Sequence, residues 1–314
     1  SSMIFVTASV ATGGLGLSDT VAANMQSNLT AFSYLLPLFG AVIVDKYIGA
    51  RYTTPVGMFI AAAGYFTGGI AKSSAGVYAM IFLVSLGLAL FKNGAIIGRV
   101  ITDKSQMDPA FSMRYTLVNV GAFIGTFLVG ILYKDVFAKD GVLGFAPCFK
   151  MAALMMVLGG LWYIFVCWRF LGDLGKLPFK KTLTEEEKAA EAKKKEETGT
   201  KQPLTTIEKK RIGAIFVASL FSIVFWIFWY LGYMPVYFYW AENMDWVVAG
   251  YQVPSTWFDA ANSLFCVILG PVTAALWKKL AARPQGDMSL FRKTGLGIAI
   301  IGVGYLFYAA IDIM

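Results

Sequence analysis

Long apolar stretches recur along this 314-residue chain, and they constrain its fold more than any other feature. A helix needs about 20 mostly apolar residues to cross the hydrocarbon core of a bilayer. Eight stretches reach that length: 27–45, 53–71, 77–100, 111–133, 147–169, 212–240, 257–277 and 292–313. The chain is therefore predicted to be an all-α integral membrane protein with about eight complete transmembrane helices.

The composition agrees with a membrane protein. Hydrophobic residues make up 57% and charged residues 15% of the chain, against about 45–50% and about 25% in soluble domains. These values exclude an ordinary soluble domain, a disordered chain and a small disulfide-stapled module. The net charge of +8 does not indicate nucleic-acid binding, because no basic stripe alternates with aromatic residues on a polar surface.

The beginning of the sequence resembles the end of a further helix. Residues 3–10 are apolar but too few to cross a membrane, and the glycine-rich stretch 12–16 follows them directly. No positively charged segment of the kind that opens a signal peptide precedes them. We therefore expect a truncated chain that starts in the tail of a first helix and stops inside or at the end of another.

The loop charges predict the orientation in the membrane. Outside residues 173–210, one set of alternate loops carries twelve Lys and Arg residues, whereas the other set carries only Lys72, Lys134, Lys139 and Lys150. Because Lys and Arg concentrate in cytoplasmic loops, the loops at 46–52, 101–110, 170–211 and 278–292 are expected to be cytoplasmic. A multi-pass protein of the plasma membrane is the predicted localisation.

A charged linker divides the sequence. Residues 173–210 hold 10 of the 27 Lys and Arg residues and 8 of the 19 acidic residues, with no apolar face. This composition is typical of a solvated connector. The predicted organisation is a helical bundle over 1–172, a cytoplasmic linker over 173–210 and the first part of a second bundle over 211–314. Two such halves are the layout of the major facilitator fold.

Lys92 is the most informative single residue. It lies 15 residues into the predicted 77–100 span, and an ionisable side chain inside a span is a functional hypothesis by default. The alternative is a lysine that extends to the membrane surface. That alternative is less favoured because Arg99 already occupies the cytoplasmic end of the same span.

Residues 39–51 resemble the cytoplasmic signature between the second and third helices of major facilitator transporters. The matching positions combine small and charged residues: Gly40, Asp45, Lys46, Gly49 and Arg51. The resemblance implies a latch at the inner gate. Lys46 carries the same charge as arginine but lacks the planar guanidinium that can bind a carboxylate through two hydrogen bonds. A plain charged loop is the alternative.

Three further segments resemble the signatures of the proton-dependent oligopeptide transporter (POT/PTR) family. Gly87-Leu88-Ala89-Leu90-Phe91-Lys92 is similar to its glycine-rich Phe-Lys motif in the fourth helix. Residues 110–123, which contain Val118-Asn119-Val120-Gly121, resemble its fifth-helix signature. Trp257-Phe258-Asp259-Ala260-Ala261-Asn262 resembles its eighth-helix motif. The likeness covers essentially the whole chain, and the motifs fall in the expected spans in the expected order.

The resemblance implies a peptide site. Tyr34 matches a tyrosine lining the site, Lys92 the lysine that binds the substrate carboxylate and takes part in proton coupling, and Asn119 and Asn262 the asparagines that hold peptide polar groups. Trp226 matches an aromatic residue of the seventh helix. A peptide zwitterion needs such a cation, amide groups and aromatic walls.

Structural explanations compete with these roles. Either asparagine can instead join two helices by hydrogen bonds, and Trp226 can face lipid. For Tyr34, a role in binding and a structural role are equally favoured. Asp259 lies one turn into its helix, so it is expected to interact favourably with the helix N-terminus.

The sequence also departs from the family pattern. Asn93-Gly94 replaces the usual Pro-Asn after the lysine, and Arg114 stands at an apolar or aromatic position. Trp229 and Tyr230 stand where the family often places acidic or amide residues, one of which forms an ion pair at the outer gate. These two residues weaken the expectation of an ordinary di- or tripeptide profile.

The favoured function is a proton-coupled symporter that imports di- and tripeptides by alternating access. The alternative within the fold is a transporter of another small anionic or zwitterionic solute, such as an amino acid, nitrate, an organic anion or a drug. An enzyme is disfavoured because the chain has no histidine, no clustered cysteines and no Gly-x-x-x-x-Gly-Lys motif, and a scaffold protein is equally disfavoured. The expected partners are peptides, protons and lipid, for a monomer without metal or cofactor.

Overall fold

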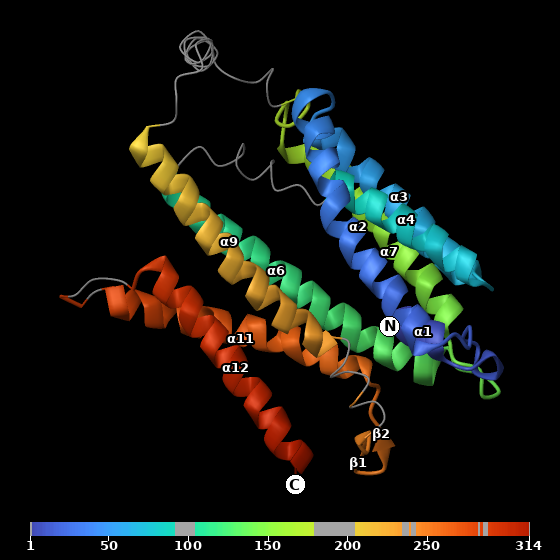
Figure 1. The fold of residues 1–314 in the computed structure, drawn as a ribbon. Coiled ribbons are helices and arrows are strands. Elements are labelled where there is room, and N and C mark those ends of the chain that lie inside the picture. The colour runs from blue at the N-terminus through green and yellow to red at the C-terminus, as the bar shows by residue number, and fades with distance from the viewer. Residues whose placement is uncertain are drawn as a thin grey trace. The chain divides into compact units, whose positions relative to one another are not determined.

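The structure is a computed structural model that describes residues 2–91, 104–178, 205–233, 239, 243–281, 283–284 and 288–313. Nearly all of its regular structure is helical (Figure 1). The elements in chain order are α1 (Ser2–Thr7), η1 (Val10–Thr12), α2 (Asp19–Lys46), α3 (Ala50–Ile70), α4 (Ser74–Phe91), α6 (Lys104–Ile131), the π-helical η2 (Leu132–Val136), α7 (Phe145–Phe170), α9 (Thr206–Tyr233), β1 (Val247–Val248), β2 (Tyr251–Gln252), α11 (Thr256–Ala281) and α12 (Leu290–Ile313).

The long helices confirm the predicted all-α membrane fold. Each of the eight predicted spans overlaps one of α2, α3, α4, α6, α7, α9, α11 and α12. The ends of the 77–100 and 212–240 spans, beyond Phe91 and Tyr233, lie outside the described residues except for residue 239. Seven of these helices, within the described residues, are long and apolar enough to cross a membrane. The chain is thus a multi-pass membrane protein.

Helix α3 is the exception to the predicted count, because its composition is less apolar than that of the other seven. It is rich in Gly, Ala and Thr, and half of its residues are buried against α4 and α7. In a bilayer, small residues at helix interfaces let backbones approach closely. The position of α3 inside the bundle explains why its sequence is less apolar than that of a lipid-facing helix.

Glycines set the closest helix contacts. A Cβ atom on Gly57 of α3 would lie 2.6 Å from the carbonyl oxygen of Gly87 in α4, and one on Gly87 would lie 2.5 Å from the carbonyl oxygen of Gly57. Likewise, a Cβ atom on Gly40 of α2 would lie 1.9 Å from the carbonyl oxygen of Ala89. Larger residues at these points would force the helices apart.

Two compact units divide the chain. Unit 1 comprises Ser1–Ala189 and Gln252–Val267, and unit 2 comprises Ala190–Tyr251 and Ile268–Met314. The first boundary lies inside the predicted 173–210 linker, and helix α11 contributes to both units. The assignment of domains at 1–172 and 211–314 remains a prediction.

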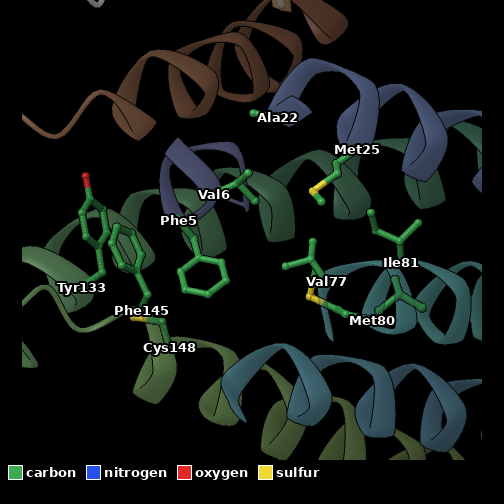
Figure 2. Close-up of a cluster of buried hydrophobic side chains, with 11 residues drawn as sticks. Phe5, Val6, Ala22, Met25, Val77, Met80, Ile81, Tyr133, Phe145 and Cys148 are labelled. Carbon is green, nitrogen blue, oxygen red and sulfur yellow. The ribbon is translucent and has the colours of Figure 1, made fainter. Parts of the chain in front are cut away.

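The core of unit 1 joins α1, α2, α4, η2 and α7 (Figure 2). Phe5 of α1 packs against Phe145 and Phe149 of α7, with ring centroids 5.6 Å and 5.4 Å apart. Tyr133 of η2 stacks on Phe145 at 5.2 Å. The remaining members of the cluster are aliphatic or sulfur-containing: Val6, Ala22, Met25, Val77, Met80, Ile81, Val84 and Cys148.

In unit 2, α9 and α12 pack through aromatic residues. The hydroxyl of Tyr305 donates a hydrogen bond of 2.6 Å to the carbonyl oxygen of Phe228, and the two rings lie 5.8 Å apart. Near the end of α11, the Lys293 ammonium lies 4.9 Å from the ring centroid of Trp277, a favourable cation–π distance.

Candidate functional site

The predicted site residues lie on four helices. Tyr34 is on α2 and is 55% exposed, Asn119 is on α6, Asn262 is on α11 and Trp226 is on α9. Lys92 lies outside the described residues, one position after the end of α4. Unit 1 contains Tyr34 and both asparagines, whereas Trp226 belongs to unit 2.

Two side-chain contacts fix the direction and register of α6 against α11 within unit 1. The Tyr115 hydroxyl lies 3.9 Å from the Cys266 Sγ. Phe127 stacks on Trp257 with ring centroids 4.4 Å apart and an interplanar angle of 18°. The residue number rises on α6 between the two contacts and falls on α11, so the helices are antiparallel.

This register brings Asn119 and Asn262 to similar heights. Asn119 lies four residues beyond Tyr115, and Asn262 lies four residues before Cys266. Counted from this contact, both displacements point the same way, by about 6 Å at a rise of about 1.5 Å per residue. Counted from the Phe127–Trp257 contact, the asparagines lie about 12 Å and about 7.5 Å away, so the two amides are on facing helices within about 5 Å of one height.

The amide of Asn119 is held by its own helix. Its Nδ2 donates a hydrogen bond of 2.9 Å to the carbonyl oxygen of Tyr115. An amide group has a second N–H and a carbonyl oxygen, so it can hydrogen-bond both to the helix and to a ligand. Both asparagines are half-buried, and their roles in binding remain predictions.

Trp226 lies in an aromatic cluster on α9. Its ring contacts Phe225 at 5.5 Å, Trp229 at 6.2 Å and Tyr230 at 5.9 Å. Trp226 is itself 45% exposed. Trp229 and Tyr230, at positions where the family often has polar residues, thus extend the aromatic surface around Trp226.

Asp259 lies in the first turn of α11 and is half-buried. A carboxylate in this position interacts favourably with the partial positive charge at a helix N-terminus. The expected structural role therefore accounts for Asp259 without a ligand.

The 39–51 segment contacts the turn that follows α7. The backbone N–H of Arg51 donates a hydrogen bond of 3.1 Å to the carbonyl oxygen of Gly175, and its Nη1 donates to the carbonyl oxygen of Gly172. A Cβ atom on Gly49 would lie 2.2 Å from the carbonyl oxygen of Gly175. Arg51 and Gly49 therefore join the start of α3 to the end of α7.

The other members of this motif lie nearby on α2. Gly40 is buried against α4, Asp45 is half-buried and Lys46 is exposed at the last position of α2. The role of the motif as an inner-gate latch remains a prediction. The sequence analysis did not find the partner of Arg51. Gly172 and Gly175, which adopt positive φ at 53° and 75°, indicate a turn at these positions but not what the turn contacts.

The turn after α7 is itself ordered by an ion pair. Lys176 Nζ lies 2.6 Å from the Asp173 carboxylate. This hydrogen bond and the lysine charge lower the pKa of Asp173, and the charge of Arg51 adds a smaller effect in the same direction. The carboxylate therefore stays ionised at neutral pH beside Arg51.

Comparisons with known proteins identify the class. The family described as PTR2, the POT family, matches residues 174–314. The uncharacterized transporter YclF of Bacillus subtilis (strain 168) is 23% identical over 94% of this chain and 66% of its own length. A di-/tripeptide transporter of Lactococcus lactis subsp. cremoris is 22% identical over 93% of this chain and 67% of its own length. The chain thus spans about two thirds of the length of these relatives.

Solved structures share the fold. A crystal structure of a peptide transporter POT in complex with alafosfalin matches with a TM-score of 0.82 and 24% identity, over 97% of this chain and 68% of that one. A POT family transporter in complex with 5-aminolevulinic acid matches with a TM-score of 0.82 and 22% identity, over 99% of this chain and 72% of that one.

The helical arrangement is that of the major facilitator fold. Residues 174–314 match the POT family, and the whole chain is similar to transporters of that family. The relatives just described are transporters, in agreement with the expectation that the chain is not an enzyme.

Proposed function

We propose that the protein containing this chain is a proton-coupled symporter that imports di- and tripeptides across the cell membrane by alternating access. The observation that carries the proposal is the pair of half-buried amides, Asn119 and Asn262, at similar heights on facing helices. A peptide bond presents one N–H and one carbonyl oxygen, and an amide on each side can satisfy both. The names of the relatives support peptides as the cargo.

The remaining roles follow from charge and shape. Lys92 provides the cation that binds the substrate carboxylate, and it takes part in proton coupling. Tyr34 and Trp226 provide aromatic surface for variable side chains, and the segment with Gly40, Asp45, Lys46, Gly49 and Arg51 latches the cytoplasmic side. The 173–210 linker lies in the cytoplasm, the protein works as a monomer, and protons and lipid are its other partners.

A second candidate keeps the fold and changes the cargo to another small anionic or zwitterionic solute. The aromatic cluster on α9 favours this alternative, because Trp229 and Tyr230 replace the polar residues of the family pattern, one of which forms an outer-gate ion pair, and so weaken the expectation of an ordinary peptide profile. The solved relatives bind alafosfalin and 5-aminolevulinic acid, so the fold accommodates more than one zwitterionic ligand. Competition by a panel of such solutes against labelled dialanine separates the two candidates.

The test is uptake by the whole protein in liposomes under an inward proton gradient. We expect gradient-driven uptake of labelled dialanine, loss of that uptake in Lys92→Ala and partial survival of peptide exchange in the same variant. The matched control is Lys72→Ala, which removes an equal charge from the loop between α3 and α4 and should transport normally. If the folded wild type takes up none of several peptides, the peptide proposal is wrong and the second candidate function is favoured.

A further inference from the structure

The contacts between α6 and α11 are concentrated at one end of the pair. Trp257 stacks on Phe127, and its indole Nε1 also donates a hydrogen bond of 3.2 Å to the Phe127 carbonyl oxygen. About two turns beyond Phe127, Lys134 Nζ donates to the carbonyl oxygen of Gln252. The ring stack and two hydrogen bonds thus join residues 127–134 to residues 252–257.

Side chains of α11 also pack directly on the α6 backbone at this end. A Cβ atom on Gly130 would lie 2.6 Å from Thr256 Oγ1 and 2.9 Å from the Trp257 ring. Thr256 is fully buried. A side chain larger than hydrogen fits at residue 130 only if Thr256 or Trp257 shifts.

The same pair of helices is open at its other end. Tyr115 is 61% exposed and Met113 is 65% exposed. Cβ atoms added to Gly121 and Gly125 of α6 would meet no atom within 4 Å. The Tyr115 end of α6 is therefore more exposed than the Gly130 contact.

The closed end is the one that the loop charges assign to the outside. Residues 134–146 and 241–256 belong to the loops that are poor in Lys and Arg. In the proposed transport cycle, access to the site alternates between the two sides of the membrane. A contact between α6, which precedes the linker, and α11, which follows it, must then part when the site faces outward.

We propose that Phe127, Gly130 and Lys134 form an outer latch with Gln252, Thr256 and Trp257, closing the outward ends of α6 and α11 beyond the asparagine pair. Trp257 is its principal residue, because it contributes both the stack and the indole hydrogen bond. The proposal rests on the proposed transport cycle but does not depend on the identity of the cargo.

The latch can be tested by accessibility. Ala261 lies one turn from Trp257 and next to Asn262, so Ala261→Cys in the whole protein with its native cysteines replaced by alanine reports on the space behind the latch. We expect slow labelling by a membrane-impermeant maleimide added from outside. Trp257→Ala should raise the labelling rate about tenfold, since it removes a stack and a hydrogen bond, and Trp257→Phe about threefold.

The matched control is Trp277→Ala, because Trp277 lies on the same helix but contacts Lys293; its labelling rate should equal that of the parent. Unchanged labelling in Trp257→Ala, or a rise only from the linker side, would overturn the latch. If Trp257→Ala does not fold, the labelling rate of Trp257→Phe is compared with that of the double variant Trp257→Phe, Lys134→Ala. The double variant should label faster, and equal rates would also overturn the latch. Because labelling needs no substrate, failure of the latch and failure of peptide transport are separate results.

Discussion

At the scale of the residue, Gly40 shows how closely the helices of unit 1 are packed. An added Cβ atom would lie 1.9 Å from the carbonyl oxygen of Ala89, a backbone atom that cannot rotate away. Gly40→Ala must therefore separate α2 from α4, and we expect a loss of about 1–3 kcal/mol in stability, typical of overpacking. Thermal unfolding in detergent, followed by size-exclusion chromatography, measures the change.

Gly125→Ala is the control for this substitution. Gly125 is also a helical glycine in a predicted span, but its added Cβ atom meets no atom within 4 Å. Alanine there should be neutral or stabilising by up to about 1 kcal/mol, because it restricts the unfolded chain. Equal stability of the two variants would show that the α2–α4 contact tolerates expansion.

Arg51 offers a second test at this scale. It donates one backbone and one side-chain hydrogen bond to the turn after α7, and bonds from charged groups are worth about 1.5–3 kcal/mol. Arg51→Ala should lose stability of that order, and Arg51→Lys should recover part of it because lysine keeps the charge but not the fork. Limited proteolysis within residues 171–178 should speed up in parallel.

Lys46→Ala is the comparison for Arg51, since Lys46 is an exposed residue of the same motif. It should leave both stability and proteolysis unchanged. If an Arg51 variant unfolds like the wild type, the contact between the start of α3 and the end of α7 does not contribute to stability.

At the scale of the element, the facing amides on α6 and α11 should act together. If Asn119 and Asn262 hold the two ends of one peptide group, each alanine variant should weaken dialanine binding by about tenfold. The double variant should lose less than the product of the two, because removing one partner already releases the peptide group. Binding measured by displacement of a labelled peptide gives all four values of the cycle.

An additive double variant with unchanged α6–α11 register would mean that the asparagines act at separate places. Ser263→Ala is a suitable control, because residue 263 neighbours Asn262 but was not matched to the peptide site. Its binding should be that of the wild type.

The helices themselves were predictable because the bilayer dictates their length and apolarity. The prediction located all eight long helices, yet it began the first complete one at residue 27, whereas α2 begins at Asp19. The polar first turns of α2 form helix without an apolar signal, with Asp19 placed favourably at the N-terminus. Local hydrophobicity is thus a guide to the span and not to the full helix.

The contacts between distant segments could not be predicted in the same way. The eighth-helix motif drew attention to Asn262, but the stacking of Trp257 on Phe127 depends on how two helices separated by 130 positions align. The same holds for Arg51 and Gly172, where a side chain meets a backbone carbonyl that carries no residue-specific signal. Sequence indicates which residues can bind, and tertiary register decides which of them meet.

At the scale of the whole molecule, the predicted membrane topology can be tested at the linker. Residues 173–210 hold 18 charged residues and no apolar face, so a protease site inserted after Thr200 should be accessible and should not disturb the helices. Twelve cationic residues against four on the two sets of loops predict that this site lies in the cytoplasm. Cleavage is therefore expected in inside-out vesicles and not in right-side-out vesicles.

A second site inserted between Asp140 and Gly141 tests the same topology from the other side. Both residues are exposed and adopt positive φ in the turn between η2 and α7, where insertions are well tolerated. Because α7 alone crosses the membrane between the two sites, this one should be cut only in right-side-out vesicles. Cleavage of both sites from one side would mean that α7 does not cross, and the alternation on which the outer latch depends would then be lost as well.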